Sequence, residues 1–280
     1  QTIELYKSKI GQGNAGVRLY VMLDGSDEPL LNEYFENGPE IGWGDGFLTV
    51  RSVKLYSDGA LGSRGAWLLE PYSDMPSTSG HSTMDTELIG SISQQALKSG
   101  FQMCTHAIGD RANREVLDQY EKTFNTLGLD SKTPRFRIEH AQHLHPADIA
   151  RFGALGILPA MQAIHMSSDR SWAIDRLGEK RIVEGAYVWQ ELLKSGAIII
   201  NGSDAPVEQV NPILGFYASV TRKTLQGTPK SGYEPEQRMT RDQALRSFTI
   251  DAAYGAFEEE LKGSVDIGKY ADFVVLDRDI

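Results

Sequence analysis

The chain has 280 residues, of which 40% are hydrophobic and 24% charged, a composition typical of globular proteins. The formal net charge is −10 and no segment gathers Lys and Arg into a patch, which argues against a nucleic-acid partner. No apolar run approaches about 18 residues, so no membrane-spanning segment is expected, and the single cysteine, Cys104, excludes an internal disulfide and a cysteine-based zinc motif.

In chain order, apolar runs typical of strands alternate with segments typical of helices. A helix is expected over residues 1–10 and a buried strand over 17–23, from which a loop rich in Gly, Asp and Asn leads to a strand over 48–56. Residues 58–84 are expected to lack regular structure, and loops of that length often cover a functional site. Further strands are expected at 101–106, 136–140, 157–161 and 197–201, and further helices at 86–98, 111–126, 146–153, 186–195, 212–224 and 241–257.

The remaining segments complete this expectation. Residues 166–185 are interpreted as a loop, and the tail is expected to hold two short strands around Gly268, ending in 272–276 (DFVVL). Six strands alternating with helices predict βαβ units and a parallel sheet, hence an α/β fold. A doubly wound sheet is the alternative, but it normally carries a Gly-rich phosphate loop after an early strand, and no GxGxxG or GxxxxGK[ST] occurs.

Polar side chains that can bind metal ions follow the ends of successive predicted strands. In a barrel of parallel strands these ends meet on the face where barrel enzymes keep their active sites. Asp204 can instead cap the next helix, and Lys54 can instead form an ion pair with Asp58 or another acid. The candidate site residues are Lys54, His106, His140, Gln162, His165 and Asp204. His143 is expected at the surface or behind the site.

Several sequence blocks carry a family resemblance. They are VKLYSDGALGSRGA, THAIGDRANREVLDQYE, RFRIEHAQHLHPADIARFGALGILPAMQAIH, NGSDAPVEQVNPILGFYASVTR and GSVDIGKYADFVVLD. Together they resemble the amidohydrolase superfamily, and within it the third amidohydrolase family, which includes N-substituted formamide deformylases and proteins labelled exoenzyme regulators. The resemblance implies a distorted (β/α)8 barrel beside a small β-sandwich built from both chain termini. We therefore expect an incomplete TIM-type barrel over residues 1–260 and a remnant of the β-sandwich over 261–280.

The resemblance also implies roles for these residues. Lys54 would react with carbon dioxide to give a carbamate that bridges two divalent metal ions, with zinc as the default. His106 and His140 would bind the second ion, and Asp204 would contact the metal and accept a proton from the attacking hydroxide. His165 and Gln162 would contact the substrate.

One departure from the family pattern is decisive. The His-x-His pair on the first family strand is missing, because His143-Leu144-His145 falls in a loop after a later strand. We expect an N-terminally truncated chain that holds one ion or none, is inactive by itself, and forms homo-oligomers through exposed barrel edges. The location is not determined, with the cytoplasm favoured.

The function expected of the intact protein is metal-dependent hydrolysis of a small-molecule amide, formamide or cyclic amide, that is, of a carbon–nitrogen bond other than a peptide bond. Two alternatives remain open. One is an ester or lactone hydrolase on the same barrel, and the other is a regulatory or ligand-binding protein without catalysis.

Overall fold

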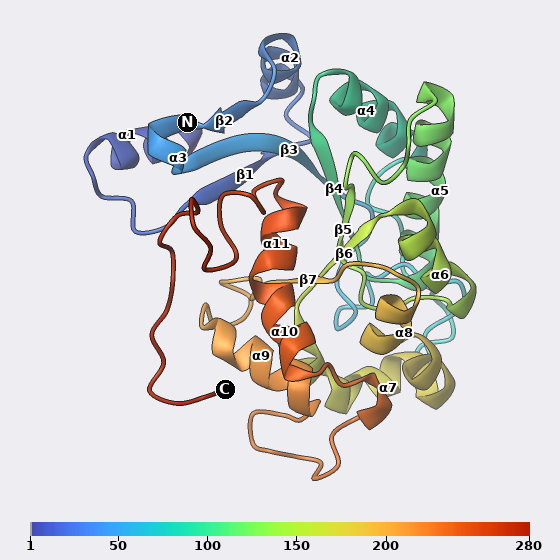
Figure 1. The fold of residues 1–280 in the computed structure, drawn as a ribbon. Coiled ribbons are helices and arrows are strands. Elements are labelled where there is room, and N and C mark those ends of the chain that lie inside the picture. The colour runs from blue at the N-terminus through green and yellow to red at the C-terminus, as the bar shows by residue number, and fades with distance from the viewer. Residues whose placement is uncertain (1) are drawn as a thin grey trace.

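Six parallel strands form one curved sheet in which each strand lies beside the one that precedes it in the parallel series (Figure 1). This is seen in a computed structural model that describes residues 2–280. The short strand β2 (Glu40–Gly42) pairs antiparallel with β3. The prediction of an incomplete (β/α)8 barrel with six parallel strands is confirmed. The strands are β1 (Leu19–Asp24), β3 (Leu48–Tyr56), β4 (Gln102–Ala107), β5 (Arg137–His140), β6 (Leu158–Met161) and β7 (Ile200–Asn201).

The central strands form because both of their faces are covered. Val50 and Val53 of β3 and Met103 of β4 have no exposed surface, as expected for strands of a parallel sheet that carries helices on its outside. The register pairs Tyr56 with His106 and Ala107 with His140. The carboxyl ends of β3, β4 and β5 therefore lie side by side, which brings the predicted site residues to one rim of the sheet.

Helices cover the sheet, and α4, α5, α6 and α8 lie along one side of it (Figure 1). Side-chain caps stabilise the first turns of several helices. At α4, Asp85 accepts a hydrogen bond from the Glu87 amide, and at α10, Thr240 and Gln243 form a capping box. Within residues 2–280, no helix has both the length and the apolar character needed to cross a membrane. The helices are α1 (Thr2–Gly11), α2 (Glu28–Asn37), α3 (Trp43–Gly46), α4 (Thr86–Lys98), α5 (Asp110–Leu127), α6 (Pro146–Leu155), α7 (Ala163–Gly185), α8 (Trp189–Lys194), α9 (Pro212–Thr221), α10 (Arg241–Phe248) and α11 (Ile250–Gly255), with a 3-10 turn η1 (Pro235–Gln237).

Two segments predicted as loops contain helices. The segment before β3 holds α2, β2 and α3, and α2 begins with a start signal that the prediction missed, since Asp27 caps the Leu30 amide ahead of a proline in the first turn. Residues 166–185 lie in α7, where Gly178 has φ +76°. That glycine breaks the helix into two parts, which obscured its periodicity in the sequence.

The tail and the last predicted helix also differ from expectation. Residues 261–280 form no strand, so the two short strands predicted around Gly268 are absent from the described tail. The predicted helix over 241–257 is two helices, α10 and α11, which meet at Thr249 with φ −125° and ψ −97°. The long segment 58–84 contains no helix or strand of its own beyond a bridge between Tyr72 and Met75, as predicted.

Candidate metal centre

A cavity of about 1180 Å³ opens at the carboxyl ends of the strands. Its wall includes apolar groups from both sides of the sheet, among them Met22 of β1 and Trp172 of α7. All six side chains predicted from the sequence line it: Lys54, His106, His140, Gln162, His165 and Asp204. The strand ends thus bring residues from five separate parts of the chain to one solvent-connected space.

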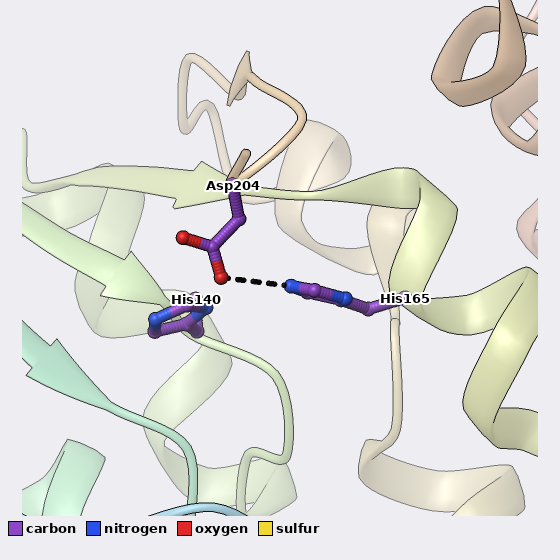
Figure 2. Close-up of side chains that lie close together, drawn as sticks. All are labelled: His140, His165 and Asp204. Atoms are coloured by element: carbon purple, nitrogen blue, oxygen red, sulfur yellow. Dashed lines mark hydrogen bonds and ion pairs between the residues drawn. The ribbon is translucent and has the colours of Figure 1, made fainter. Parts of the chain in front are cut away.

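Three of these side chains form a compact group. His140 ends β5, His165 lies in the first turn of α7, and Asp204 follows β7. Figure 2 shows the Asp204 carboxylate directed between the two imidazole rings, with its Oδ2 3.2 Å from Nε2 of His165. One nitrogen of each ring and one carboxylate oxygen all lie within 4.8 Å of one another, which is close enough for the three to share one cation.

Backbone conformation helps to aim this group. His140 has φ +76° and Asp204 has φ +57°, a left-handed region that residues other than glycine rarely adopt. Each such residue costs on the order of 1–3 kcal/mol, and these conformations concentrate at functional sites. The two turns direct both side chains back over the open rim of the sheet.

His106 and Lys54 lie beside this group. The rings of His106 and His140 meet edge to face with centroids 4.5 Å apart, and Nε2 of His106 is 3.3 Å from Oδ1 of Asp58. Lys54 points into the same cavity, with Nζ 4.7 Å from the centre of the Tyr56 ring. Within residues 2–280 Lys54 forms no salt bridge, so the alternative of a Lys54–Asp58 ion pair is wrong.

Gln162 contacts His140. Its Nε2 donates to the Ala160 carbonyl at 3.0 Å, which turns its Oε1 toward Nδ1 of His140 at 2.7 Å. An amide oxygen can only accept, so Nδ1 of His140 carries the proton. Nε2 of His140 is then left with its lone pair free for a cation. The residue predicted to touch the substrate therefore orients a candidate ligand.

Charges around the site favour neutral nitrogen ligands. Burial, together with the positive charges of His106 and Lys54, lowers the pKa of His140 to about 3. Burial also lowers the pKa of Lys54, although the Glu139 carboxylate opposes this shift. A neutral imidazole can bind a metal ion. A lysine whose pKa is lowered has more of the neutral amine that reacts as a nucleophile.

Asp204 and His165 shift in opposite directions. Burial disfavours the charged Asp204 carboxylate, but the His165 hydrogen bond and the charges of His140 and Lys54 outweigh it and hold the pKa of Asp204 below its ordinary value. Burial opposes charge on His165 too, yet the Asp204 hydrogen bond and the Asp169 carboxylate raise the pKa of His165. The carboxylate is therefore ionised at neutral pH.

The residues present fit a divalent cation. Two imidazoles and a carboxylate within 4.8 Å match the three-ligand sets of catalytic zinc sites, which keep a further position for water or substrate. The three-residue set contains His165, which the sequence predicted to contact the substrate. It does not contain His106 or Lys54, which the sequence predicted as metal ligands.

Sequence reasoning missed some residues around the site. Asp58 is fully buried beneath His106, and Asp169 and Glu208 line the cavity beside His165. Asp169 was hidden by the interpretation of residues 166–185 as a loop. Of the two positions predicted for His143, the surface one is wrong, because His143 is 3% exposed and packs edge-on against Tyr187 at 5.5 Å.

A sequence profile described as "Amidohydrolase family" matches residues 13–280. The chain is 40% identical over 232 residues to Protein LONG AFTER FAR-RED 3 of Arabidopsis thaliana, covering 82% of this chain and 39% of that protein. It is 35% identical over 233 residues to the putative amidohydrolase YtcJ of Bacillus subtilis (strain 168), covering 83% and 43%. An N-substituted formamide deformylase of Arthrobacter pascens is 30% identical over 186 residues, covering 66% and 33%. The chain thus spans about two fifths or less of these relatives.

Solved structures agree with the fold. A metal-dependent hydrolase from Pyrococcus horikoshii OT3 superimposes with a TM-score of 0.85 at 31% identity, covering 99% of this chain and 54% of that one.

Proposed function

Because the chain belongs to the amidohydrolase family, we propose that it supplies the catalytic face of a metal-dependent hydrolase that cleaves carbon–nitrogen bonds other than peptide bonds. The observation that carries the proposal is the His140–His165–Asp204 group at the open end of a parallel barrel. The names of two relatives, a putative amidohydrolase and an N-substituted formamide deformylase, support this bond type.

The proposed ligands are His140, His165 and Asp204, and His106, whose ring centre lies 4.5 Å from that of His140, and Lys54 are placed to join them around the same ion. A divalent cation, zinc by default for mixed imidazole and carboxylate ligands, would lower the pKa of water to about 7 and polarise the scissile carbonyl. We propose that Lys54 carries a carbamate when the site is loaded, as the family resemblance implies.

Residues of the chain itself would transfer the proton from the attacking water to the leaving group. Ionised Asp204 only accepts hydrogen bonds, so it can take a proton from the attacking water and pass it to the leaving nitrogen as general base and then general acid. Nε2 of His165 lies 3.2 Å from Oδ2 of the same carboxylate, so the two residues would approach the cation from adjacent positions.

Two measurements test the proposal. Elemental analysis after dialysis against Zn²⁺ should find one ion bound per chain, and in the intact protein Asp204→Asn should abolish hydrolysis across a panel of amides, formamides and cyclic amides. Two ions at full occupancy would contradict the expected ligand count. Turnover of esters and lactones alone would move the function to ester hydrolysis on the same barrel.

A second candidate is ligand binding without catalysis. The relative at 40% identity has a name that specifies no reaction, which keeps this candidate in view. Bound metal with no turnover of any panel member would favour it over the hydrolase.

Residues 261–280 are proposed to belong to a separate β-sandwich unit, as the resemblance implies. Four of their apolar side chains are largely exposed: Val265, Ile267, Val274 and Val275 are at least 81% exposed. Side chains of this kind are expected to pack against further structure.

A further inference from the structure

Asp58 is a buried carboxylate at the start of the long segment 58–84. Its side chain is fully buried and accepts three backbone hydrogen bonds: Oδ2 from the amides of Trp67 and Gly109, each at 2.8 Å, and Oδ1 from the amide of Ile108 at 3.0 Å. The carboxylate thus joins the end of β3, the middle of the segment and the turn between β4 and α5.

The same contacts fasten the segment beside the site. The carbonyl of Trp67 accepts from the amides of Arg111 and Ala112 in the first turn of α5 at 3.1 and 3.2 Å. A Cβ on Gly109 would lie 2.0 Å from the Trp67 carbonyl oxygen, so only glycine permits this close approach. Trp67 is therefore held through both its amide and its carbonyl.

Asp58 also faces a candidate metal ligand. Among residues 2–280, Asp58 makes no salt bridge with lysine or arginine, and Nε2 of His106 lies 3.3 Å from its Oδ1. That nitrogen is buried and forms no hydrogen bond at its present angle. A small rotation of the ring would direct an Nε2 proton at the carboxylate and satisfy both groups.

We propose that Asp58 is a positioning residue that holds the His106 proton on Nε2, leaves Nδ1 to face the cavity, and thereby couples the seating of segment 58–84 to cation binding. The inference rests on the metal site proposed above and assigns the segment a role in that site. Carboxylates that accept a hydrogen bond from a ligating imidazole fix its orientation and raise its basicity. Because one carboxylate serves both His106 and Trp67, a cation that orders His106 also stabilises the Trp67 attachment.

Asp110 offers a matched control. It is another largely buried acid that anchors the same segment, since its Oδ1 accepts from the amides of Leu69 at 2.9 Å and Arg111 at 3.0 Å. It contacts none of the proposed metal ligands. Asp58→Asn and Asp110→Asn therefore both loosen segment 58–84, but only the first alters the environment of His106.

The first test needs no metal. The long-range ¹H–¹⁵N spectrum of the imidazoles of the metal-free protein, with His106 assigned through His106→Gln among the six histidines, should show His106 protonated on Nε2. Asp58→Asn should shift this tautomer and Asp110→Asn should not. A wild-type spectrum with the proton on Nδ1, or one that Asp58→Asn leaves unchanged, overturns the inference without reference to any variant's stability or to the proposed function.

The second test uses Zn²⁺ alone. By titration calorimetry, Asp58→Asn should weaken binding by about 10–100-fold, the usual effect of removing such a partner, while Asp110→Asn keeps the wild-type affinity within about threefold. Zn²⁺ should slow hydrogen exchange at the Trp67 and Gly109 amides of the wild type and not of Asp58→Asn. Equal weakening by both variants would show that the segment acts only as general structure and would overturn the inference. A wild type that binds no Zn²⁺ would overturn the proposed function and the coupling together, and would leave the tautomer result as the test of the Asp58–His106 contact.

Discussion

At the scale of single residues, the site depends on which nitrogen of each imidazole is already engaged. His140 gives Nδ1 to Gln162. We expect Gln162→Leu to leave that nitrogen buried without a partner and to free the ring to turn. Zn²⁺ affinity should then fall by about 10–100-fold, measured by competition with a chromogenic chelator.

Gln162→Glu is the matched control, since it keeps an oxygen acceptor at the same position. It should bind Zn²⁺ at least as tightly as the wild type. If Gln162→Leu matched the wild type as well, Gln162 would have no part in orienting His140, and its predicted contact with substrate would be the better interpretation.

His143 gives a pH prediction. Burial, aided by the charge of Arg181, lowers the pKa of His143 to about 3, against about 6.5 in an unfolded chain. Between these values the unfolded chain binds the extra proton, so His143 makes the protein less stable as pH falls from about 6.5 toward 3, by about 1.4 kcal/mol per pH unit. Above this window it contributes nothing to the pH dependence.

We expect His143→Leu to reduce the slope of the unfolding free energy against pH by about 1.4 kcal/mol per pH unit, which corresponds to the uptake of one proton on unfolding. Urea unfolding of both metal-free proteins between pH 4 and 6 measures the two slopes. Parallel curves for the two proteins would show that His143 takes up no proton on unfolding.

At the scale of elements, α7 is tied to the chain after α9 through Glu234. This carboxylate contacts Arg170 of α7 at 2.6 Å and the fully buried Arg222 at 3.1 Å. Glu234→Ala would leave two guanidinium groups buried without a counter-charge, and removing one partner of a buried pair costs about 3–5 kcal/mol. Urea unfolding should show a loss of this size.

Glu87→Ala is the comparison, because Glu87 pairs with Lys122 while both side chains are more than half exposed. Such pairs contribute about 0–1 kcal/mol. Similar losses in the two variants would mean that the Glu234 network is not energetically distinct from a surface pair.

The elements that could be predicted were those with strong local signals. The strand over 48–56 is rich in Leu and Val and was placed with its observed bounds, and strand order followed from the alternation with helices. The helix α7 could not be found in this way because Gly178 interrupts it, and 272–276 has strand composition but forms no strand. The local sequence pattern determines which secondary structure a segment can form. Whether the segment adopts that structure also depends on the surrounding parts of the fold.

The sequence could predict which residues lie at the candidate site, but not which of them contact one another. Strand-end position identified His106, His140 and Asp204 as residues of one rim. Which of them meet depends on φ at His140 and on the seating of His165 in the first turn of α7. Neither is encoded in spacing along the chain.

At the scale of the whole molecule, the sheet has two outer strands, β1 and β7. Exposed strand edges tend to pair with other chains unless they are blocked. We therefore propose that the protein self-associates through these edges, and light scattering after size-exclusion chromatography should give a dimer or larger species. A monomer across the concentration range would refute this.

The strand order also bears on how the protein is made. Each parallel strand after β1 is hydrogen-bonded to its predecessor in that series, so the growing sheet can accept each new unit as it leaves the ribosome, without waiting for later residues. The tail and the segment after α11 depart from this order, because Asp272 reaches back 254 positions to Arg18 beside β1 and Glu258 reaches back 209 positions to Thr49 of β3. These contacts can form only after the strands between their partners have been synthesised.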